Sequence, residues 1–257
     1  MEVTDTHLRP RMVAGIEVIP LCDAIGPMGG ALAGPLSDVF LGVRPGDLPD
    51  GWILHFHCFL LRDPAGTTVL VDTGIGGADS TASTWAPVPG VLGSELARVG
   101  VAPADVDVVV LTHLHSDHAS GAVHAGVPVF PNARHVVQQA ELDWINGIPS
   151  HPISEAVLRP LDGALLTVSG AAEVTPGVTV VPAPGHTPGH QVVEVGDVVI
   201  TGDVILHPIQ LADPAIVYAH DEDSREAAAT RADLIHRVRA AGGTLAPAHF
   251  PEPFVTP

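Results

Sequence analysis

The segment His113-Leu114-His115-Ser116-Asp117-His118 carries three imidazoles and a carboxylate within six residues. Imidazole and carboxylate are the ligands that first-row divalent metals prefer, zinc above all. The apolar run 108–111 directly before the cluster predicts a strand, so the cluster falls on a loop at a sheet edge. Alternate side chains of an extended chain point the same way, so His113, His115 and Asp117 can share one side. His118 stands where the following helix begins, and the pattern therefore predicts a metal site.

Three further candidate ligands also follow predicted strands. His186 lies in the segment 184–190, Pro-Gly-His-Thr-Pro-Gly-His, where Pro and Gly fix a rigid loop after the strand 178–182. Asp203 follows the strand 198–201, and His249 follows the last strand, 244–248. A lone His or Asp in such a place is more often a cap or a hydrogen-bonded polar residue. Their shared placement at strand ends, in a chain that already carries the cluster, favours metal ligands.

The composition narrows the class of protein. The formal net charge of −18 argues against nucleic acid and anionic membrane surfaces as partners, because both need a basic footprint. All 11 basic residues are Arg, which excludes chemistry that needs a lysine. The two cysteines, Cys22 and Cys58, form no Cys-x-x-Cys motif and no disulfide framework. The N-terminus lacks a signal-peptide pattern, and no apolar run reaches the length of a membrane span, so we expect a cytoplasmic protein.

The chain reads as strands, helix, strand and metal-binding loop, then again as strands, helix and strand. This order fits mixed sheets with helices on their outer faces in a single α/β domain over 1–257. The N-terminal part, 1–50, is expected to give a strand and then a Gly/Pro-rich loop over 25–51, a candidate lid or subunit contact. We expect strands at 15–20, 52–62, 67–71, 107–112, 128–130, 135–137, 178–182, 191–195, 198–201 and 244–248, and helices at 90–100, 138–146 and 223–241.

With these pieces in place, the chain resembles the metallo-β-lactamase superfamily of hydrolases. The resemblance runs in the family's order from about Gly51 to the end of the chain. It rests on Asp72-Thr73-Gly74, the cluster from His113 to His118, His186 within its Pro/Gly loop, Thr201-Gly202-Asp203, and His249.

The resemblance implies a four-layer αβ/βα sandwich, the metallo-β-lactamase fold, with two divalent ions where the sheets meet. It implies that one ion is held by His113, His115 and His186, that the second is held by Asp117, His118 and His249, and that Asp203 bridges them. Seven ligands, two of them carboxylates, suit two ions better than one, because neighbouring cations need shared anions between them. Zinc is the expected metal, with manganese, iron and cobalt as alternatives.

Details of the resemblance indicate which branch of the superfamily the chain resembles most. One major group of lactamases has Cys at the Asp203 position, and another lacks a bridging carboxylate there. The nucleases of the superfamily carry basic surfaces or extra domains, and its diiron flavoproteins add a flavin domain. The segment 202–210 looks most like the lactonase and organophosphate (aryl-ester) hydrolase branch. Lactonases of this type often place a Tyr three positions after the bridging Asp, whereas this chain has Leu206 there and its one Tyr is Tyr218.

The expected function is hydrolysis of a lactone or a small carboxylic or phosphoric ester by a metal-bridging hydroxide. The alternatives are an acyl or glutathione thioesterase of the glyoxalase II type and a non-catalytic metal-binding member of the fold. Asp117 is the expected catalytic residue, orienting the nucleophile and carrying its proton to the leaving group. Asp72 is expected to accept an N–H from a metal-ligating His, and a turn-forming Asp is the alternative.

The remaining expectations concern the pocket and the partners. The candidate pocket residues are His57, His207 and Phe250, and His190 is interpreted as structural. The partner is a small-molecule substrate, with neither nucleic acid nor membrane, and a homodimer is the habit of the family's nearest branch.

Overall fold

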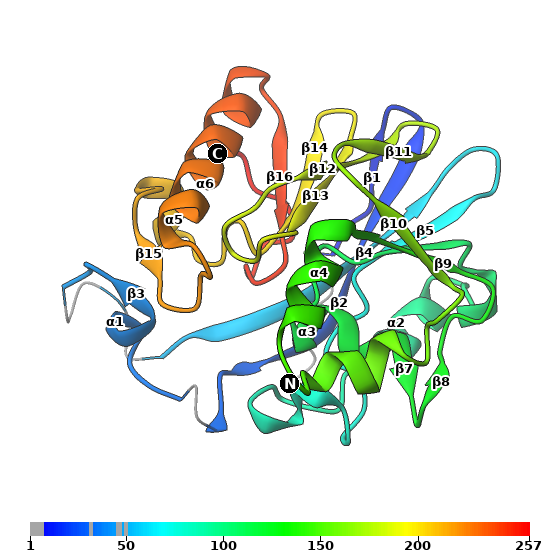
Figure 1. Ribbon diagram of the computed structural model, residues 1–257. Helices are drawn as coiled ribbons and strands as arrows, with labels where there is room; N and C mark the ends of the chain where they lie inside the picture. Colours follow the sequence, from blue (N-terminus) through cyan, green and yellow to red (C-terminus); the bar gives the residue numbers. More distant parts are fainter. Residues whose placement is uncertain (1–7, 31–32, 45–47, 49–50) are drawn as a thin grey trace.

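The computed structural model describes residues 8–30, 33–44, 48 and 51–257. Within them, two mixed sheets face each other, with helices on both outer faces (Figure 1). The first sheet has the order β1 (Arg11–Val13), β2 (Ile16–Pro27), β4 (Ile53–Arg62), β5 (Thr68–Val71), β6 (Val108–Val110), β9 (Arg134–Gln138) and β10 (Leu165–Val168). The second has the order β11 (Ala172–Thr175), β12 (Val178–Pro182), β13 (Gln191–Val195), β14 (Val198–Gly202) and β16 (Thr244–Pro247).

The shorter elements surround these sheets. Two small ribbons pair β3 (Phe40–Leu41) with β15 (Val217–Tyr218) and β7 (Val123–His124) with β8 (Val127–Pro128). The α-helices are α1 (Leu36–Val39), α2 (Leu92–Arg98), α3 (Ser116–Ala119), α4 (Gln139–Gly147), α5 (Ile209–Ala212) and α6 (Ser224–Ala240). Single turns of 3₁₀-helix lie at Thr81–Thr84, Pro103–Asp105 and Ser120–Ala122, and a short π-helix at Ser154–Leu158.

Side-chain alternation along the strands produces three separate apolar layers. Leu60 and Leu70 of the first sheet pack against Leu96 of α2 in one layer. Their strand neighbours Phe59 and Val71 point the other way, into the layer between the two sheets. In the third layer, α6 packs on the second sheet through Leu234, Ile235 and Val238, against Val192, Val199 and Leu245. This order of helix, sheet, sheet and helix confirms the expected four-layer αβ/βα sandwich.

Local sequence signals account for several of these elements. The strands predicted at 52–62 and 67–71 are β4 and β5, an antiparallel hairpin. The predicted helix 223–241 is α6, and the Asp223 carboxylate accepts hydrogen bonds from the backbone N–H groups of Arg225 and Glu226. The strand predicted at 128–130 is shifted to Val127–Pro128, because the chain turns at Phe130, whose ring is buried in the core.

The N-terminal expectations are only partly covered. β2 runs on to Pro27, while α1 and β3 lie within the stretch 25–51 and were not predicted. Residues 31–32, 45–47 and 49–50 of that stretch lie outside the described residues. Its role as a lid or subunit contact and the single-domain organisation over 1–257 stay predictions. Among the described residues, no helix combines the length and apolar character that crossing a bilayer requires.

Candidate metal centre

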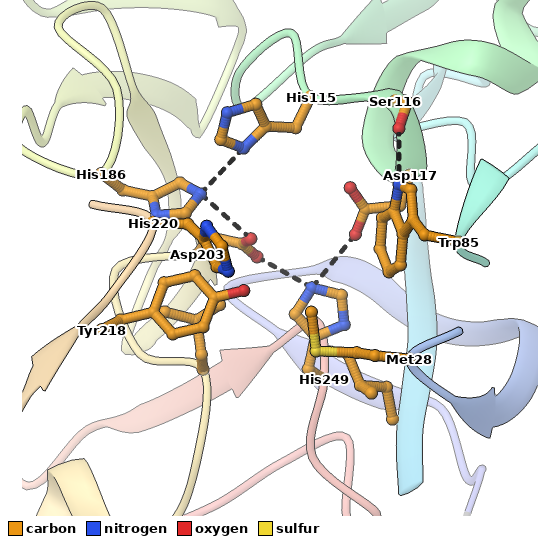
Figure 2. A pocket seen from close by; sticks show the side chains of 12 residues that line it. Met28, Trp85, His115, Ser116, Asp117, His186, Asp203, Tyr218, His220 and His249 are labelled. Carbon is orange, nitrogen blue, oxygen red and sulfur yellow. Dashed lines mark hydrogen bonds and ion pairs between the residues drawn. The ribbon is translucent and has the colours of Figure 1, made fainter. Parts of the chain in front are cut away.

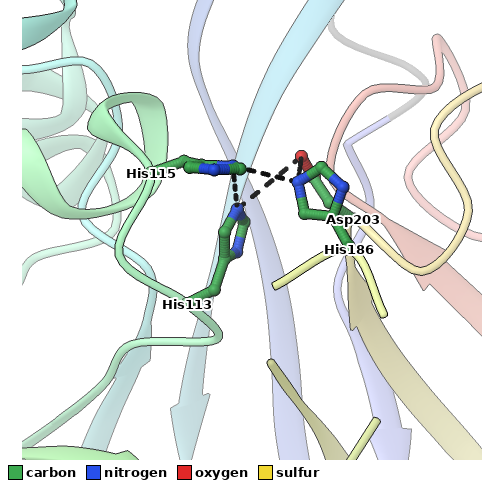
Figure 3. Close-up of side chains that lie close together, drawn as sticks. All are labelled: His113, His115, His186 and Asp203. Carbon is green, nitrogen blue, oxygen red and sulfur yellow. Dashed lines mark hydrogen bonds and ion pairs between the residues drawn. The ribbon is translucent and has the colours of Figure 1, made fainter. Parts of the chain in front are cut away.

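Four loops bring the predicted ligands to one edge of the sandwich, where the two sheets meet (Figures 1 and 3). The cluster from His113 to His118 follows β6, and α3 begins inside it at Ser116. His186 lies between β12 and β13, Asp203 directly follows β14, and His249 follows β16. The first sheet thus supplies four of the seven side chains, and the second sheet supplies three.

The first group consists of His113, His115, His186 and Asp203 (Figure 3). His115 Nδ1 lies 3.1 Å from His113 Nε2 and 3.0 Å from His186 Nε2. Asp203 Oδ2 lies 3.3 Å from His186 Nε2 and 3.8 Å from His113 Nε2. Two nitrogens bound at about 2.0–2.1 Å to one tetrahedral zinc ion lie about 3.3 Å apart. The spacing therefore matches three imidazoles and one carboxylate oxygen arranged around a single ion.

The second group consists of Asp117, His118, His249 and again Asp203. His118 Nε2 and His249 Nε2 each lie 3.3 Å from Asp117 Oδ2. The same two nitrogens each lie 3.1 Å from Asp203 Oδ1. The two oxygens of Asp203 are thus divided, with Oδ2 directed to the first group and Oδ1 to the second.

Unpaired polar atoms indicate a missing partner in the second group. His118 Nε2 and Asp203 Oδ1 are buried and have no hydrogen-bond partner, although they lie only 3.1 Å apart. A buried polar atom without a partner is costly, so such atoms mark a missing partner. All ligand atoms within each group lie within 4.8 Å of one another. The donors are imidazole nitrogens and carboxylate oxygens, which suit zinc and other first-row divalent ions.

The pKa values of the metal-free groups also indicate that positive charge is needed between these side chains. Burial lowers the pKa of His186 and His249, but the neighbouring carboxylates outweigh it and raise these pKa values to about 9 and about 10. At His118 burial also lowers the pKa, but Asp203, Asp117 and Asp72 together raise it well above its usual value. Conversely, burial raises the pKa of Asp203, but the charges of His118 and His249 hold it well below its usual range. Protons on imidazoles thus balance the buried carboxylates, and metal binding would replace those protons.

Two imidazoles of the first group are already in the form that binds metal. Burial lowers the pKa of His115 to about 3 and that of His113 well below its usual value. Neutral imidazole is the ligand form, so these two rings need lose no proton to bind an ion at physiological pH.

Asp72 lies at the end of β5, behind the second group. Its Oδ2 lies 2.8 Å from His118 Nδ1, and both of its oxygens accept hydrogen bonds from Thr112, from the backbone N–H and the hydroxyl. A carboxylate in this position fixes the ring orientation of His118 and leaves Nε2 facing the second group. Asp72 has a φ of 60°, and Asp is among the few residues that adopt such backbone readily.

Asp221 supplies a second supporting carboxylate that sequence reasoning missed. Its Oδ1 lies 3.0 Å from His186 Nδ1, and its Oδ2 accepts a hydrogen bond from the buried Arg231 at 3.3 Å. The pair therefore orients His186 as Asp72 orients His118. Neither residue stands in a recognisable motif, because Asp221 lies 35 positions from His186 along the chain.

Glu141 is another buried carboxylate that the sequence did not reveal. One oxygen accepts from the backbone N–H of Leu114 at 2.8 Å, and the other accepts from Thr187 and from Gly189. A residue of α4 thus joins the loop that carries His113 and His115 to the loop that carries His186.

His190 has a backbone role, in line with its interpretation as structural. Its Nε2 accepts a hydrogen bond from the backbone N–H of Asp203 at 3.0 Å. Gly202 precedes Asp203 with a φ of 47°, and a Cβ there would lie 2.7 Å from His190 Nε2. The tight turn after β14 therefore requires glycine to bring Asp203 into the centre.

A cavity of about 210 Å³ opens onto both groups (Figure 2). Its polar floor contains Asp117 and Asp203, and Trp85 at its wall donates a hydrogen bond from Nε1 to Ser116 Oγ at 3.1 Å. Figure 2 shows the Tyr218 hydroxyl directed toward the space between Asp203 and His249. The full lining is Met28, Leu54, Trp85, His115, Ser116, Asp117, His186, Asp203, Leu206, Tyr218, His220 and His249.

The three candidate pocket residues from the sequence are absent from this lining. His57 is buried, with Nε2 2.8 Å from the carbonyl oxygen of Phe250. His207 packs between the rings of Phe40 and Trp52, and the Phe250 ring lies in the apolar layer under α6. These residues were predicted because they lie near a metal ligand in the sequence or on the strand face expected to line the pocket. Neither criterion determines whether a side chain points into the cavity or into the core.

Tyr218 is the pocket residue that the sequence pattern did not assign. The position three residues after Asp203 holds Leu206, which lines the cavity without a hydroxyl. Tyr218 instead lies 15 residues after Asp203 along the chain, and pairing of β15 with β3 brings it to the cavity. The phenol ring lies 6.0 Å from the ring of His186.

Comparison with known proteins agrees with the geometry. The family model of the metallo-beta-lactamase superfamily matches residues 57–249, well over half of the chain. The chain belongs to this superfamily. The matched region includes all seven side chains of the two groups, from His113 to His249.

Similar curated proteins of the superfamily are lactonases. An N-acyl homoserine lactonase from Bacillus sp is 33% identical over 168 residues, which are 60% of this chain and 62% of that protein. The N-acyl homoserine lactonase AttM from Agrobacterium fabrum is 34% identical over 160 residues, 52% of this chain and 56% of that protein. The chain thus spans less than two thirds of the length of the curated relatives it matches.

Solved structures of superfamily members share the fold. AidC, a dizinc quorum-quenching lactonase solved with a product bound, has a TM-score of 0.82 at 20% identity, over 95% of this chain and 91% of AidC. The hydrolase AbOPH has a TM-score of 0.77 at 24% identity, over 95% of this chain and 90% of that one. Both structures are under 25% identical to this chain, so they show that the fold is shared.

Proposed function

We propose that this protein is a dinuclear metal-dependent hydrolase that opens lactones or small carboxylic esters, with N-acyl homoserine lactones as the first substrates to test. The observation that carries the proposal is the division of the Asp203 carboxylate, with one oxygen 3.3 Å from His186 and the other 3.1 Å from His118 and His249. One carboxylate with an oxygen beside the imidazoles of each group is what a bridging ligand needs.

The residues of the two groups would hold the ions as the resemblance implies. His113, His115 and His186 would bind the first ion, Asp117, His118 and His249 the second, and Asp203 both. Zinc is the expected metal, and manganese, iron and cobalt suit the same donors. When bound, two divalent ions this close supply hydroxide at neutral pH and polarise a carbonyl or phosphoryl oxygen.

Asp117 is the residue to which we assign proton transfer. It lies on the cavity floor, 3.3 Å from both His118 and His249. Burial raises the pKa of Asp117, but His118 and His249 together hold it below its usual value, so without metal the side chain is a carboxylate. In the metal-bound protein this carboxylate can accept a hydrogen bond from the attacking water. After ring opening, the same oxygen can pass the proton to the leaving alkoxide.

The cavity fits a small, uncharged acyl substrate. Met28, Leu54 and Leu206 give it an apolar wall, and the Tyr218 hydroxyl gives it a donor for a substrate carbonyl oxygen. Its volume of about 210 Å³ lies below the roughly 300–1,000 Å³ of sites for drug-sized ligands, which favours a lactone ring or short ester.

A thioesterase is the second candidate. Glutathione thioesters are anionic and need basic side chains, but the lining residues include neither Arg nor Lys. A phosphoric ester stays within the same enzyme class, because a pair of divalent ions would polarise a phosphoryl oxygen as it would a carbonyl oxygen. A non-catalytic metal-binding member would need neither a cavity open to both groups nor a Tyr218 hydroxyl directed toward them.

A substrate panel tests the proposal. The zinc-loaded protein is assayed against an N-acyl homoserine lactone, an aryl ester, an organophosphate triester and an acyl-glutathione thioester, with and without a chelator. We expect chelator-sensitive hydrolysis with the lactone or aryl ester turned over fastest. Thioester turnover far above the others would establish the alternative, and a metal-loaded protein inactive on all four would refute a hydrolase of this class.

A further inference from the structure

A third group of metal-binding side chains lies outside the site described above, on β2 and β4. It consists of Cys22, His55 and His57, with one candidate ligand atom of each within 4.8 Å of the others. Cys22 pairs with His57 across the two strands, and His55 lies two residues before His57, so all three belong to the same face. An irregularity in the pairing between Cys22 and Ile25 alters the register next to His55. Cys22 Sγ lies 3.8 Å from His55 Nδ1.

The tautomer of His57 is fixed by its surroundings. Its Nε2 lies 2.8 Å from the carbonyl oxygen of Phe250, which can only accept, so Nε2 carries the proton and donates. Burial lowers the pKa of His57 to about 3, which keeps the ring neutral. Nδ1 then has a bare lone pair, and this atom is buried without a hydrogen-bond partner. A ring nitrogen bound to a backbone carbonyl, with the other nitrogen free to coordinate, is the usual arrangement of a metal-ligating His.

We propose that Cys22, His55 and His57 form a third, mononuclear metal site that takes Zn²⁺ or a similar thiophilic transition-metal ion. In a tetrahedral zinc site with Zn–S near 2.3 Å and Zn–N near 2.0–2.1 Å, sulfur and nitrogen lie about 3.6 Å apart, close to the observed 3.8 Å. One thiolate and two imidazoles select zinc or copper over magnesium, calcium or manganese. Cys22 and His55 are only partly buried, so water can complete the coordination.

The charges around the third site set the conditions for its occupancy. Burial raises the pKa of Cys22 to about 11, so the ion must displace the thiol proton into solvent. Binding there is consequently weaker at low pH than at high pH. Glu252 raises the pKa of His55 against the larger lowering effect of burial, and so supplies a nearby negative charge to balance the cation.

The third site is bonded to the loop that carries His249. His249 Nδ1 donates to the carbonyl oxygen of His55 at 2.8 Å, and the backbone N–H of His57 donates to Ala248 at 2.9 Å. The bond between His57 and Phe250 makes a third link. An ion on Cys22, His55 and His57 would therefore stiffen the segment 248–250.

Cobalt substitution tests the third site without relying on activity. The metal-free, reduced protein is titrated with Co²⁺, and the near-ultraviolet spectrum is followed for a thiolate-to-cobalt charge-transfer band. The dinuclear groups contain only His and Asp, so such a band reports a cysteine ligand. We expect the band in the wild-type protein, its loss in Cys22→Ser, and its retention in Cys58→Ala, which removes the other thiol, buried in the apolar core.

A second variant covers the case in which Cys22→Ser fails to fold. His55→Ala leaves both cysteines and the His55 backbone carbonyl in place, and the side chain is only partly buried. We expect it to weaken the affinity that the band reports by more than about 10-fold, since loss of even an outer hydrogen-bond partner costs about 10–100-fold. Absence of the band in the wild type, its persistence in Cys22→Ser, or unchanged affinity in His55→Ala would overturn the proposal.

Discussion

The groups around Asp203 include His249, and the group of Cys22, His55 and His57 is hydrogen-bonded to the loop that carries His249, but the two are built in different ways. The first is assembled from loops at the ends of four strands and buries two carboxylates among imidazoles. The second stands on the neighbouring strands β2 and β4, beside a shift in their register, and contains a thiol and two imidazoles. Buried carboxylates need a counter-charge in every state of the protein, whereas a protonated thiol and neutral rings do not. We therefore expect the first to require its metal and the second to tolerate its absence.

Asp203→Asn should have the largest effect, because it replaces one oxygen of the carboxylate that the two groups share with an NH₂ group. We expect bound zinc at these groups to fall below two ions per chain and lactone hydrolysis to fall by roughly 10³-fold, the scale of losing a central electrostatic group. Elemental analysis and steady-state assays measure both. Asp162→Asn, at an exposed position, is the matched control. Loss of the cobalt–thiolate band in Asp203→Asn would contradict the independence of the two sites, since the third site should not depend on Asp203.

Asp117→Asn should mainly affect turnover. The amide keeps an oxygen toward His118 and His249 but cannot take a proton, so we expect kcat to fall by roughly 10²–10⁴-fold, as for loss of a general base. The pH profile of kcat/KM should lose its acidic limb. Unaltered turnover with full metal content would contradict the role assigned to this residue.

Asp72→Asn should have an intermediate effect, through His118 rather than through substrate. Loss of such an outer hydrogen-bond partner costs about 10–100-fold in metal affinity or activity. We expect weaker binding of one of the two ions, measured by competition with a chromophoric chelator. If metal affinity and kcat both match the wild type, Asp72 is a turn residue and not a support for His118.

Tyr218→Phe should lower kcat/KM for a lactone by about 10-fold, the scale of one hydrogen bond of 1.4 kcal/mol. The metal content should stay at the wild-type value, because the phenol lines the cavity and belongs to neither group. A change in metal content without a change in kcat/KM would assign Tyr218 to the structure of the centre instead.

The smallest expected effect is a difference in how the stability of the metal-free and the metal-loaded protein changes with pH. In the metal-free protein the pKa values of His186 and His249, about 9 and about 10, lie above the 6.5 of the unfolded chain. Their protonated forms thus stabilise the fold fully below pH 6.5, and this contribution is lost as the pH rises through 9 and 10.

We expect the Tm of the metal-free protein to fall between pH 7 and 10 by roughly 2–8 °C more than that of the zinc-loaded protein, which corresponds to roughly 1–2 kcal/mol at this size. Parallel thermal melts across this range measure it. An equal or smaller fall in the metal-free protein would contradict the proposed exchange of protons for metal.

The sequence allowed prediction of residues that lie in a short motif or directly after a strand. The density of His113 to His118 and the Gly/Pro boundaries around β12 to β14 predicted the candidate ligands. The order of strands and helices predicted mixed sheets with outer helices, and the four-layer sandwich was implied by the resemblance to the superfamily. Edge strands such as β10 and β11 are short and only partly buried, so they left no clear alternation. The seven predicted ligands meet in two groups because the strands before them all end at the same sheet edge.

The supporting residues were hidden because tertiary packing alone places them. Asp221 and Glu141 act on residues 35 and 27 or more positions away, and no spacing rule links them to their partners. Tyr218 reaches the cavity through pairing of β15 with β3, across a segment without regular periodicity. Cys22, read from the sequence only as an isolated thiol, faces His57 because of strand register.

Anomalous diffraction at the zinc edge, from crystals of zinc-loaded protein, would show whether Asp203 joins two metal ions. At the two groups around Asp203 we predict two strong peaks about 3.5–4 Å apart, as in two-metal sites generally, with one oxygen of Asp203 on each, apart from any peak at Cys22, His55 and His57. A single peak, or two peaks that Asp203 does not join, would contradict the account.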